Sequence, residues 1–248
     1  MLPAARRFLG LGVFFFLAGW GAASPGFCAS PDAGETTTPK IAVVVDPGHG
    51  GDDTGLKLSA AGPAEKEFAL KVGQELRGLL ARDARLSVWL TRTKDQAVSL
   101  NARQTLANAK NAQVFVSLHV CASGPGHPAV FIFTHRVSRD EALKTLVGRA
   151  QAGDVRTVPW DEAQAAMKSA SRSLAKTLGQ AWETGRESPA AEVRLQEVPL
   201  GGLTGVRAPA VLVEMPLPGA EGAKASEIAG RQAAKVLAAG IRDFLDRR

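Results

Sequence analysis

The stretch VVVDPGHGGDDTG, residues 43–55, shows most clearly which fold the chain adopts. A run of β-branched residues leads into glycines on either side of one histidine, His49, and then into two acids. An apolar run of this kind, bounded by proline and glycine, is typical of a buried strand followed by a tight loop. We therefore predict a strand over 41–46 that delivers His49 just beyond its carboxyl end.

Glycine-rich loops after strands often bind phosphate, but this loop lacks both of the usual patterns. It has no Gly-Lys-Ser/Thr, and the dinucleotide-binding fingerprint breaks at Asp53. The adjacent carboxylates of Asp52 and Asp53 would also repel a phosphate group. We interpret both acids as turn and capping residues, which leaves His49 to be explained by the rest of the chain.

Further apolar runs recur along the chain and alternate with helical patterns. The predicted strands cover 41–46, 86–91, 113–119, 129–135 and 209–214, and the predicted helices cover 65–82, 98–111, 161–185 and 224–247. Nearly continuous apolar strands indicate a sheet that is covered on both faces. The fold class is therefore α/β: a single three-layer α/β/α domain with a mostly parallel central sheet of about six strands.

Residues 1–30 have the layout of a secretory signal peptide. Arg6 and Arg7 precede an apolar run of about 15 residues that small residues follow, whereas a membrane-spanning helix needs about 20. We expect residues 31–40 to be a flexible lead-in and 41–248 to be the folded domain. The exported protein would then lie in the periplasm or elsewhere in the cell envelope; the export route stays open between the general and twin-arginine pathways.

Charge and cysteine content narrow the partners of the exported chain. The formal charge of +6 falls by two to +4 when the signal, with its two arginines and no acid, is removed. Lysines and arginines do not cluster with aromatic residues, which argues against a nucleic-acid partner. Cys121 alone would survive signal removal, so we expect no internal disulfide. We expect a monomer.

Polar residues stand at the ends of three predicted strands, where α/β folds gather their working groups. They are His49, His119 and Glu214, and a further acid, Glu65, opens the first predicted helix. Two imidazoles and one carboxylate are a common ligand set for a catalytic Zn²⁺. The second carboxylate would then be free to act as a base.

Each of these residues also has an ordinary structural explanation. His49 could satisfy turn hydrogen bonds, His119 could be a buried core histidine, and Glu65 could favour the positive end of a helix. Glu214 is harder to explain in this way, because a carboxylate at the end of an apolar strand is costly to bury without a partner. The four residues together favour a functional site.

Other residues are weaker candidates for the same chemistry. Glu67 is the alternative metal ligand if Glu65 does not bind the ion, and His135 is the alternative to His119. We expect His127 to lie in a surface turn and both Trp160 and Cys121 to serve packing.

The same motifs resemble the zinc-dependent N-acetylmuramoyl-L-alanine amidases of the amidase_3 type. The resemblance is carried by DPGHGG at 46–51, Glu65-Lys66, SLHVCA at 117–122 and PAVLVE at 209–214. It covers residues 41–119 and 160–216, and four ordered motifs are more specific than any one of them.

This resemblance implies a zinc amidase domain in which His49, Glu65 and His119 bind one Zn²⁺ and Glu214 is the catalytic carboxylate. The implied substrate is peptidoglycan, cut at the amide between N-acetylmuramic acid and the L-alanine of the stem peptide, and a regulatory activator protein is a further expected partner. A zinc peptidase acting within the stem peptide and a non-catalytic peptidoglycan-binding protein stay as alternatives.

The chain departs from that family pattern in three places. Val120 and Cys121 follow the second histidine, and 215–219 replaces a more regular segment after Glu214. Residues 136–160 exceed what small relatives carry, and we expect this segment to border or cover the site. Because the chain has no tyrosine, we expect the metal together with a backbone N–H or an arginine such as Arg92 or Arg103 to stabilise an oxyanion.

Overall fold

The computed structural model describes residues 39–57, 63–122, 128–136, 163–185, 191–216 and 223–248. Pro39–Arg248 form one compact unit. The expected signal peptide, residues 1–30, and most of the lead-in, 31–40, lie outside the described residues. Among the described helices, none combines the length and the apolar character that crossing a membrane requires.

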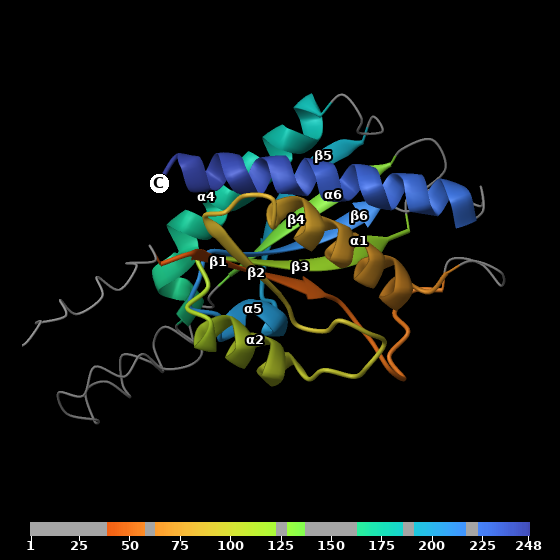
Figure 1. Ribbon diagram of the computed structural model, residues 1–248, viewed down its shortest axis with the longest axis horizontal. Helices are drawn as coiled ribbons and strands as arrows, with labels where there is room; N and C mark the ends of the chain where they lie inside the picture. The colour runs from red at the N-terminus through yellow and green to blue at the C-terminus, as the bar shows by residue number, and fades with distance from the viewer. Residues whose placement is uncertain (1–38, 58–62, 123–127, 137–162, 186–190, 217–222) are drawn as a thin grey trace, which may run out of the picture. The chain divides into compact units, whose positions relative to one another are not determined.

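Six strands form one sheet in the order β2-β1-β3-β6-β4-β5 (Figure 1). Their bounds are β1 Ile41–Pro47, β2 Leu86–Leu90, β3 Val114–Cys121, β4 Ala129–His135, β5 Glu192–Val198 and β6 Ala210–Pro216. All neighbouring strands run parallel except β4 and β6, which are antiparallel. The predicted mostly parallel sheet of six strands is confirmed.

Among the described strands, β5 is the one that the apolar runs did not locate. Its sequence, EVRLQEV, alternates apolar and polar residues and carries three charges, as an edge strand with one wetted face does. Its Val193 and Leu195 lie toward helix α4, since a Cβ on Gly179 would approach both side chains. The interior strands β1, β3 and β6 are richer in apolar residues because a strand lies on each side of them and helices cover their faces.

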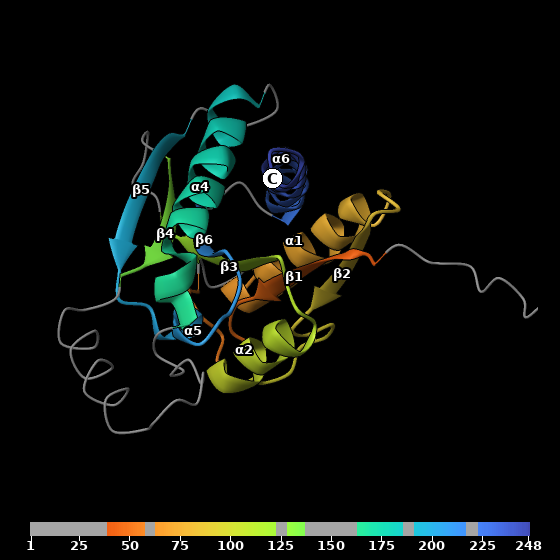
Figure 2. The ribbon, with the colours of Figure 1, turned by 90° about the vertical axis from the view of Figure 1, so that its left-hand side faces the viewer.

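Helices cover both faces of the sheet, which confirms the three-layer architecture (Figure 2). On one face lie α1 (Glu65–Leu80), α4 (Ala163–Thr184) and α6 (Ala223–Asp246); on the other lie α2 (Leu100–Ala109) and α5 (Gly201–Thr204). The long helices α1 and α4 both pack against α6. Two separate apolar clusters fill the spaces between the three layers.

Successive residues of β1 belong to different apolar clusters. Val43 and Val45 belong to the cluster under α1, α4 and α6, whereas Val44 packs with Ala107 of α2 and with Phe115. Successive side chains of a strand point to opposite faces, so both faces need apolar residues here. Each fully buried valine contributes about 1.5–3 kcal/mol. This explains why β1 reads as one unbroken apolar run.

Helix α4 packs closely against α6 at Gly240. A Cβ at this position would lie 2.9 Å from Leu178 Cδ2 and 3.1 Å from Ala181 Cβ. The glycine therefore permits a helix contact that a larger residue would push apart.

We predict that Gly240→Ala lowers the free energy of unfolding by about 1 kcal/mol, because an overpacking cost of about 1–3 kcal/mol exceeds a helix-propensity gain of about 1 kcal/mol. Gly78→Ala is the matched control: its Cβ would meet nothing within 4 Å. That change should raise the free energy of unfolding by about 0.5–1 kcal/mol. Urea unfolding of both variants measures the difference, and equal shifts would contradict the close contact.

Candidate metal centre

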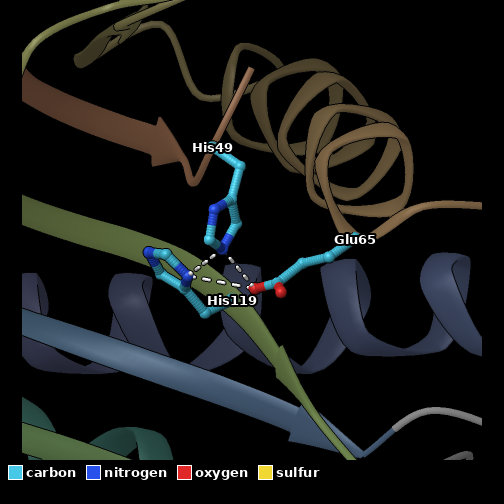
Figure 3. Close-up of side chains that lie close together, drawn as sticks. All are labelled: His49, Glu65 and His119. Carbon is cyan, nitrogen blue, oxygen red and sulfur yellow. Dashed lines mark hydrogen bonds and ion pairs between the residues drawn. The ribbon is translucent and has the colours of Figure 1, made fainter. Parts of the chain in front are cut away.

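Three side chains from distant segments converge at the carboxyl edge of the sheet (Figure 3). His49 follows β1, Glu65 is the first residue of α1, and His119 lies in β3, two residues before its end. Glu65 Oε1 lies 2.9 Å from His49 Nε2 and 3.0 Å from His119 Nδ1, and the two imidazole nitrogens are 3.1 Å apart. The structure thus brings together the three residues that were predicted from the sequence as metal ligands.

This triangle of one oxygen and two nitrogens fits a single metal ion. Ligand bonds of about 2.0–2.1 Å in tetrahedral geometry place neighbouring donor atoms about 3.3 Å apart, so the triangle needs to open by only a few tenths of an ångström. Within the described part of the chain, these are the His, Cys, Asp or Glu residues grouped closely enough to hold a metal. Two imidazoles and one carboxylate leave a fourth position for water or substrate.

Two buried arginines fix the loop that carries His49. Arg92 donates to the carbonyl oxygens of Pro47 and Gly48 at 3.0 and 2.7 Å. Arg103 donates to the carbonyl oxygens of Pro47 and His49, each at 2.8 Å. These bonds hold a backbone that includes His49 at a φ of 58°, a conformation that residues other than glycine rarely adopt.

The expected oxyanion role of Arg92 and Arg103 is not supported by this arrangement. The two residues are 1% and 5% exposed, and their guanidinium donors are occupied by backbone carbonyls and, for Arg103, by a buried carboxylate. A group that donates inward to the loop cannot at the same time face a substrate. Both arginines build the site without entering it.

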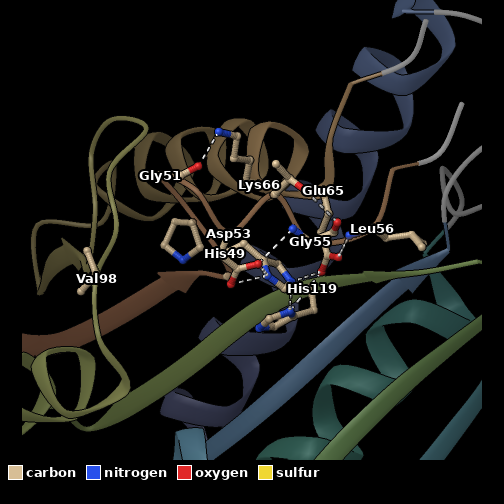
Figure 4. Close-up of polar contacts among 12 residues, drawn as sticks. His49, Gly51, Asp53, Gly55, Leu56, Glu65, Lys66, Val98 and His119 are labelled. Atoms are coloured by element: carbon tan, nitrogen blue, oxygen red, sulfur yellow. Dashed lines mark hydrogen bonds and ion pairs between the residues drawn. The ribbon is translucent and has the colours of Figure 1, made fainter. Parts of the chain in front are cut away.

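Asp53 does more than the turn role that the sequence suggested (Figure 4). Both of its carboxylate oxygens lie 2.9 Å from His49 Nδ1, and Oδ1 also accepts the N–H of Gly55 at 3.1 Å. A carboxylate on the outer nitrogen fixes the tautomer that presents Nε2 as a ligand, and it raises the basicity of the ring. Asp53 therefore orients the first histidine; the GGDD pattern placed an acid there but did not reveal this partner.

Glu65 is held ionised by its surroundings. Burial would raise its pKa, but the bonds to His119 and His49 and from the N–H of Leu56 outweigh burial and keep that pKa well below its usual range. The Val120 N–H also donates to Oε1, at 3.0 Å. An ionised acid at this place further benefits from the positive end of α1. Side-chain bonds to Glu65 in turn raise the pKa of His49.

Two glycines allow these ligands to come so close. A Cβ on Gly48 would lie 2.4 Å from Cε1 of His119, and a Cβ on Gly55 would lie 2.5 Å from Oε2 of Glu65. Gly55 also has a φ of +60°. The glycines of the DPGHGGDDTG stretch therefore serve close approach of the ligand side chains as well as the turn itself.

Glu214 lies beside the triangle and outside it. It is the register partner of His119 in the parallel pair of β3 and β6, so the two side chains share a face of the sheet. Burial raises the pKa of Glu214, although the charge of nearby His119 opposes the rise. A half-buried carboxyl with a raised pKa beside a metal site suits proton transfer near neutral pH.

The substitute ligands lie elsewhere. Glu67 is exposed on α1, facing the groove toward α6. His135 ends β4, and because β4 runs antiparallel to β6, it lies at the opposite end of the sheet, where its Nδ1 accepts the N–H of Leu200. Cys121 is half-buried, and its thiol contacts the carbonyl oxygen of Ala129. His127, Trp160, residues 137–160 and residues 217–219 lie outside the described residues.

Fold and site together define an α/β/α domain with a candidate mononuclear metal centre. The chain belongs to the N-acetylmuramoyl-L-alanine amidase family Amidase_3, whose model matches residues 43–243. The resemblance seen in the sequence motifs is thereby confirmed.

Individual relatives agree with this assignment. The N-acetylmuramoyl-L-alanine amidase CwlM of Bacillus licheniformis is 44% identical over 116 residues, which cover 43% of this chain and 45% of the relative. The amidase AmiC of Neisseria meningitidis is 28% identical over 245 residues, covering 87% of this chain and 57% of the relative. The chain therefore spans about half the length of these relatives.

Solved structures share the fold. The catalytic domain of the amidase CwlV from Bacillus (Paenibacillus) polymyxa has a TM-score of 0.60 at 23% identity, with 84% of this chain and 99% of that chain covered. The amidase CwlD from Clostridioides difficile, solved in complex with the GerS lipoprotein, has a TM-score of 0.62 at 20% identity, with 84% and 100% covered.

We predict that Asp53→Ala weakens Zn²⁺ binding by about 10–100-fold, because the ring of His49 loses the carboxylate that orients it. The Zn²⁺ affinity of Asp53→Asn should lie between those of Asp53→Ala and the parent, since the amide oxygen still accepts a hydrogen bond. Competition with a chromogenic chelator measures the affinity. Asp52→Ala, at the adjacent exposed acid, is the control, and equal affinities for Asp52→Ala and Asp53→Ala would contradict the orienting role.

Proposed function

We propose that this protein is a zinc-dependent peptidoglycan hydrolase that cuts the amide between N-acetylmuramic acid and the L-alanine of the stem peptide. The observation that carries the proposal is the convergence of His49, Glu65 and His119, with Glu214 in register beside His119. Membership of the amidase family supplies the bond to be cut. The same arrangement would serve other amide hydrolases, so the substrate rests on the family.

The chain's own residues divide the work of hydrolysis. His49 Nε2, His119 Nδ1 and an oxygen of Glu65 would hold the Zn²⁺, and Asp53 would orient His49. When bound, zinc acts as a Lewis acid that makes water more acidic and polarises a carbonyl. Glu214 would accept the proton of the attacking water and deliver it to the departing alanine nitrogen. One carboxylate on β6 thus serves both proton transfers.

We further propose that the protein is exported and works as a monomer on peptidoglycan in the periplasm or cell envelope. The amino-terminal sequence supports export. A regulatory activator protein is a further proposed partner; CwlD, a structural neighbour, was solved in complex with a lipoprotein.

The first test separates metal binding from turnover. We predict that Glu214→Gln retains zinc but lowers amide cleavage by about 10²–10⁴-fold, because the general base is lost. His119→Ala should lose both zinc and activity, because a ligand is removed. Zinc content by elemental analysis and release of stem peptides from sacculi measure the two properties.

Glu67→Gln is the matched control for Glu214→Gln, because Glu67 is an exposed acid on α1. It should behave like the parent in both assays. A Glu214→Gln variant that releases peptides at the parental rate would remove Glu214 from the mechanism.

The second test identifies the bond. Mass spectrometry of digested sacculi should find peptides that begin at L-alanine together with peptide-free glycan strands. Chelation of the metal should abolish this release, and added Zn²⁺ should restore it. Cleavage within the stem peptide would instead identify a zinc peptidase, and sedimentation with sacculi without any release would identify a binding protein.

A further inference from the structure

A row of register partners extends from the metal centre across the sheet to its edge. His119 on β3 pairs with Glu214 on β6, Glu214 pairs with Phe131 on β4, and Phe131 pairs with Arg194 on β5. Side chains of directly opposed residues lie on the same face of a sheet. The row therefore continues the site from the proposed general base to an aromatic ring and then to a cation.

A second row lies one step behind the first and has a similar character. Leu212 pairs with Phe133, and Phe133 pairs with Gln196. The rings of Phe131 and Phe133 are stacked, with centroids 5.9 Å apart and planes within 4° of parallel. Both phenylalanines are only partly buried. Together they form an apolar shelf on the sheet face that also carries Glu214.

Arg194 closes the shelf at the edge strand. Its guanidinium carbon lies 5.5 Å from the centroid of Phe131, and one of its nitrogens lies 2.7 Å from a carboxylate oxygen of Glu192. The Arg194 side chain is 48% exposed, and that of Glu192 is 62% exposed. An ion pair so open to water contributes little to stability, so a carboxylate of a bound molecule can compete with Glu192 for the guanidinium.

The position of Glu214 indicates that the peptide part of the substrate, rather than the glycan, contacts this shelf. In the proposed reaction Glu214 delivers a proton to the departing alanine nitrogen, so the departing peptide lies on the side of Glu214. The shelf begins immediately beyond Glu214, on the side away from His119. The row therefore extends from the site on the side of the leaving peptide.

The span of the row sets the length of peptide that it can bind. Neighbouring strands are about 4.8 Å apart, which puts Arg194 about 10 Å from Glu214 along the row. An extended peptide advances about 3.3–3.6 Å per residue. The guanidinium would therefore meet an acidic group on the second or third residue of the stem.

We infer that Phe131, Phe133 and Arg194 form a subsite for an acidic stem peptide, in which the rings contact the peptide and Arg194 binds its carboxylate. This inference rests on the proposed function for the direction of the peptide. Continuity with the metal centre and the charge of Arg194 support the choice of occupant.

The decisive measurement compares two substrates, each with the amide joined to an L-alanine. One carries a full acidic stem peptide, and the other ends at the alanine. We expect Arg194→Ala to lower the ratio of kcat/KM for the long substrate to that for the short one by about tenfold, as for loss of a charge-assisted hydrogen bond. Arg194→Lys should recover part of the ratio, because it keeps the charge.

Arg247→Ala is the matched control, because Arg247 is also an exposed arginine in an ion pair, with Asp243 at 2.6 Å on α6. Its ratio should equal that of the parent. An unchanged ratio in Arg194→Ala, or an equal fall in Arg247→Ala, would overturn the subsite.

Direct binding separates failure of the subsite from failure of the proposed function. The probe is a tripeptide that begins with L-alanine and carries carboxylates on its second and third residues, with a carboxamide version for comparison. By calorimetry on the zinc-loaded parent, the acidic peptide should bind about tenfold more tightly than the amide version, and Arg194→Ala should remove this difference.

Phe131→Leu should weaken binding of both peptides several-fold, because it removes the ring while keeping an apolar side chain. If the parent cuts neither substrate, the proposed amidase function fails, and the binding results alone decide on the subsite. No preference for the acidic peptide, a preference that survives in Arg194→Ala, or tighter binding of a peptide-free glycan fragment would each overturn it.

Discussion

The buried ion pair between Asp46 and Arg103 is the interaction on which the loop after β1 depends. Arg103 Nη1 lies 2.6 Å from Asp46 Oδ1, and both side chains are 6% exposed. The same carboxylate accepts hydrogen bonds from Thr91, just after β2, and from Ser117 on β3. One acid thus ties three neighbouring strands to α2. Removing one member of such a pair leaves a buried charge, at a cost of about 3–5 kcal/mol, so loop geometry and domain stability depend on the same contact.

The metal centre depends on this loop because its three ligands come from segments that share no local structure. Glu65 Oε1 contacts both imidazoles, and Leu56 and Val120 hold the carboxylate through backbone N–H groups. Lys66 adds a further link by donating to the carbonyl oxygen of Gly51 at 2.8 Å (Figure 4). It also donates to Asp95, at 2.6 Å. The positions of the three ligands therefore depend on contacts with several separate segments of the fold, and the ligands must be deprotonated to bind a metal ion.

The sequence predicted the parts of this structure that follow from periodicity and from strand ends. Apolar runs located five strands, and the rule that working groups lie at the carboxyl ends of parallel strands brought His49 and His119 together. Prediction from sequence failed where the outcome depends on three-dimensional contacts. β5 was missed because its charged residues interrupt the apolar run. Arg92 and Arg103 were wrong candidates for the oxyanion donor because sequence does not show which carbonyls a guanidinium meets. The partnership of Asp53 with His49 was hidden for the same reason.

The order of strands also bears on which positions of the sheet tolerate substitution. His49, His119 and Glu214 sit on or next to interior strands, where a change of residue disturbs packing on both faces. Strand β5 forms one edge of the sheet, beside β4, and is largely open to solvent. A substitution on β5 therefore disturbs fewer packed neighbours than one on an interior strand. Changes at this edge can leave the positions of His49, His119 and Glu214 intact.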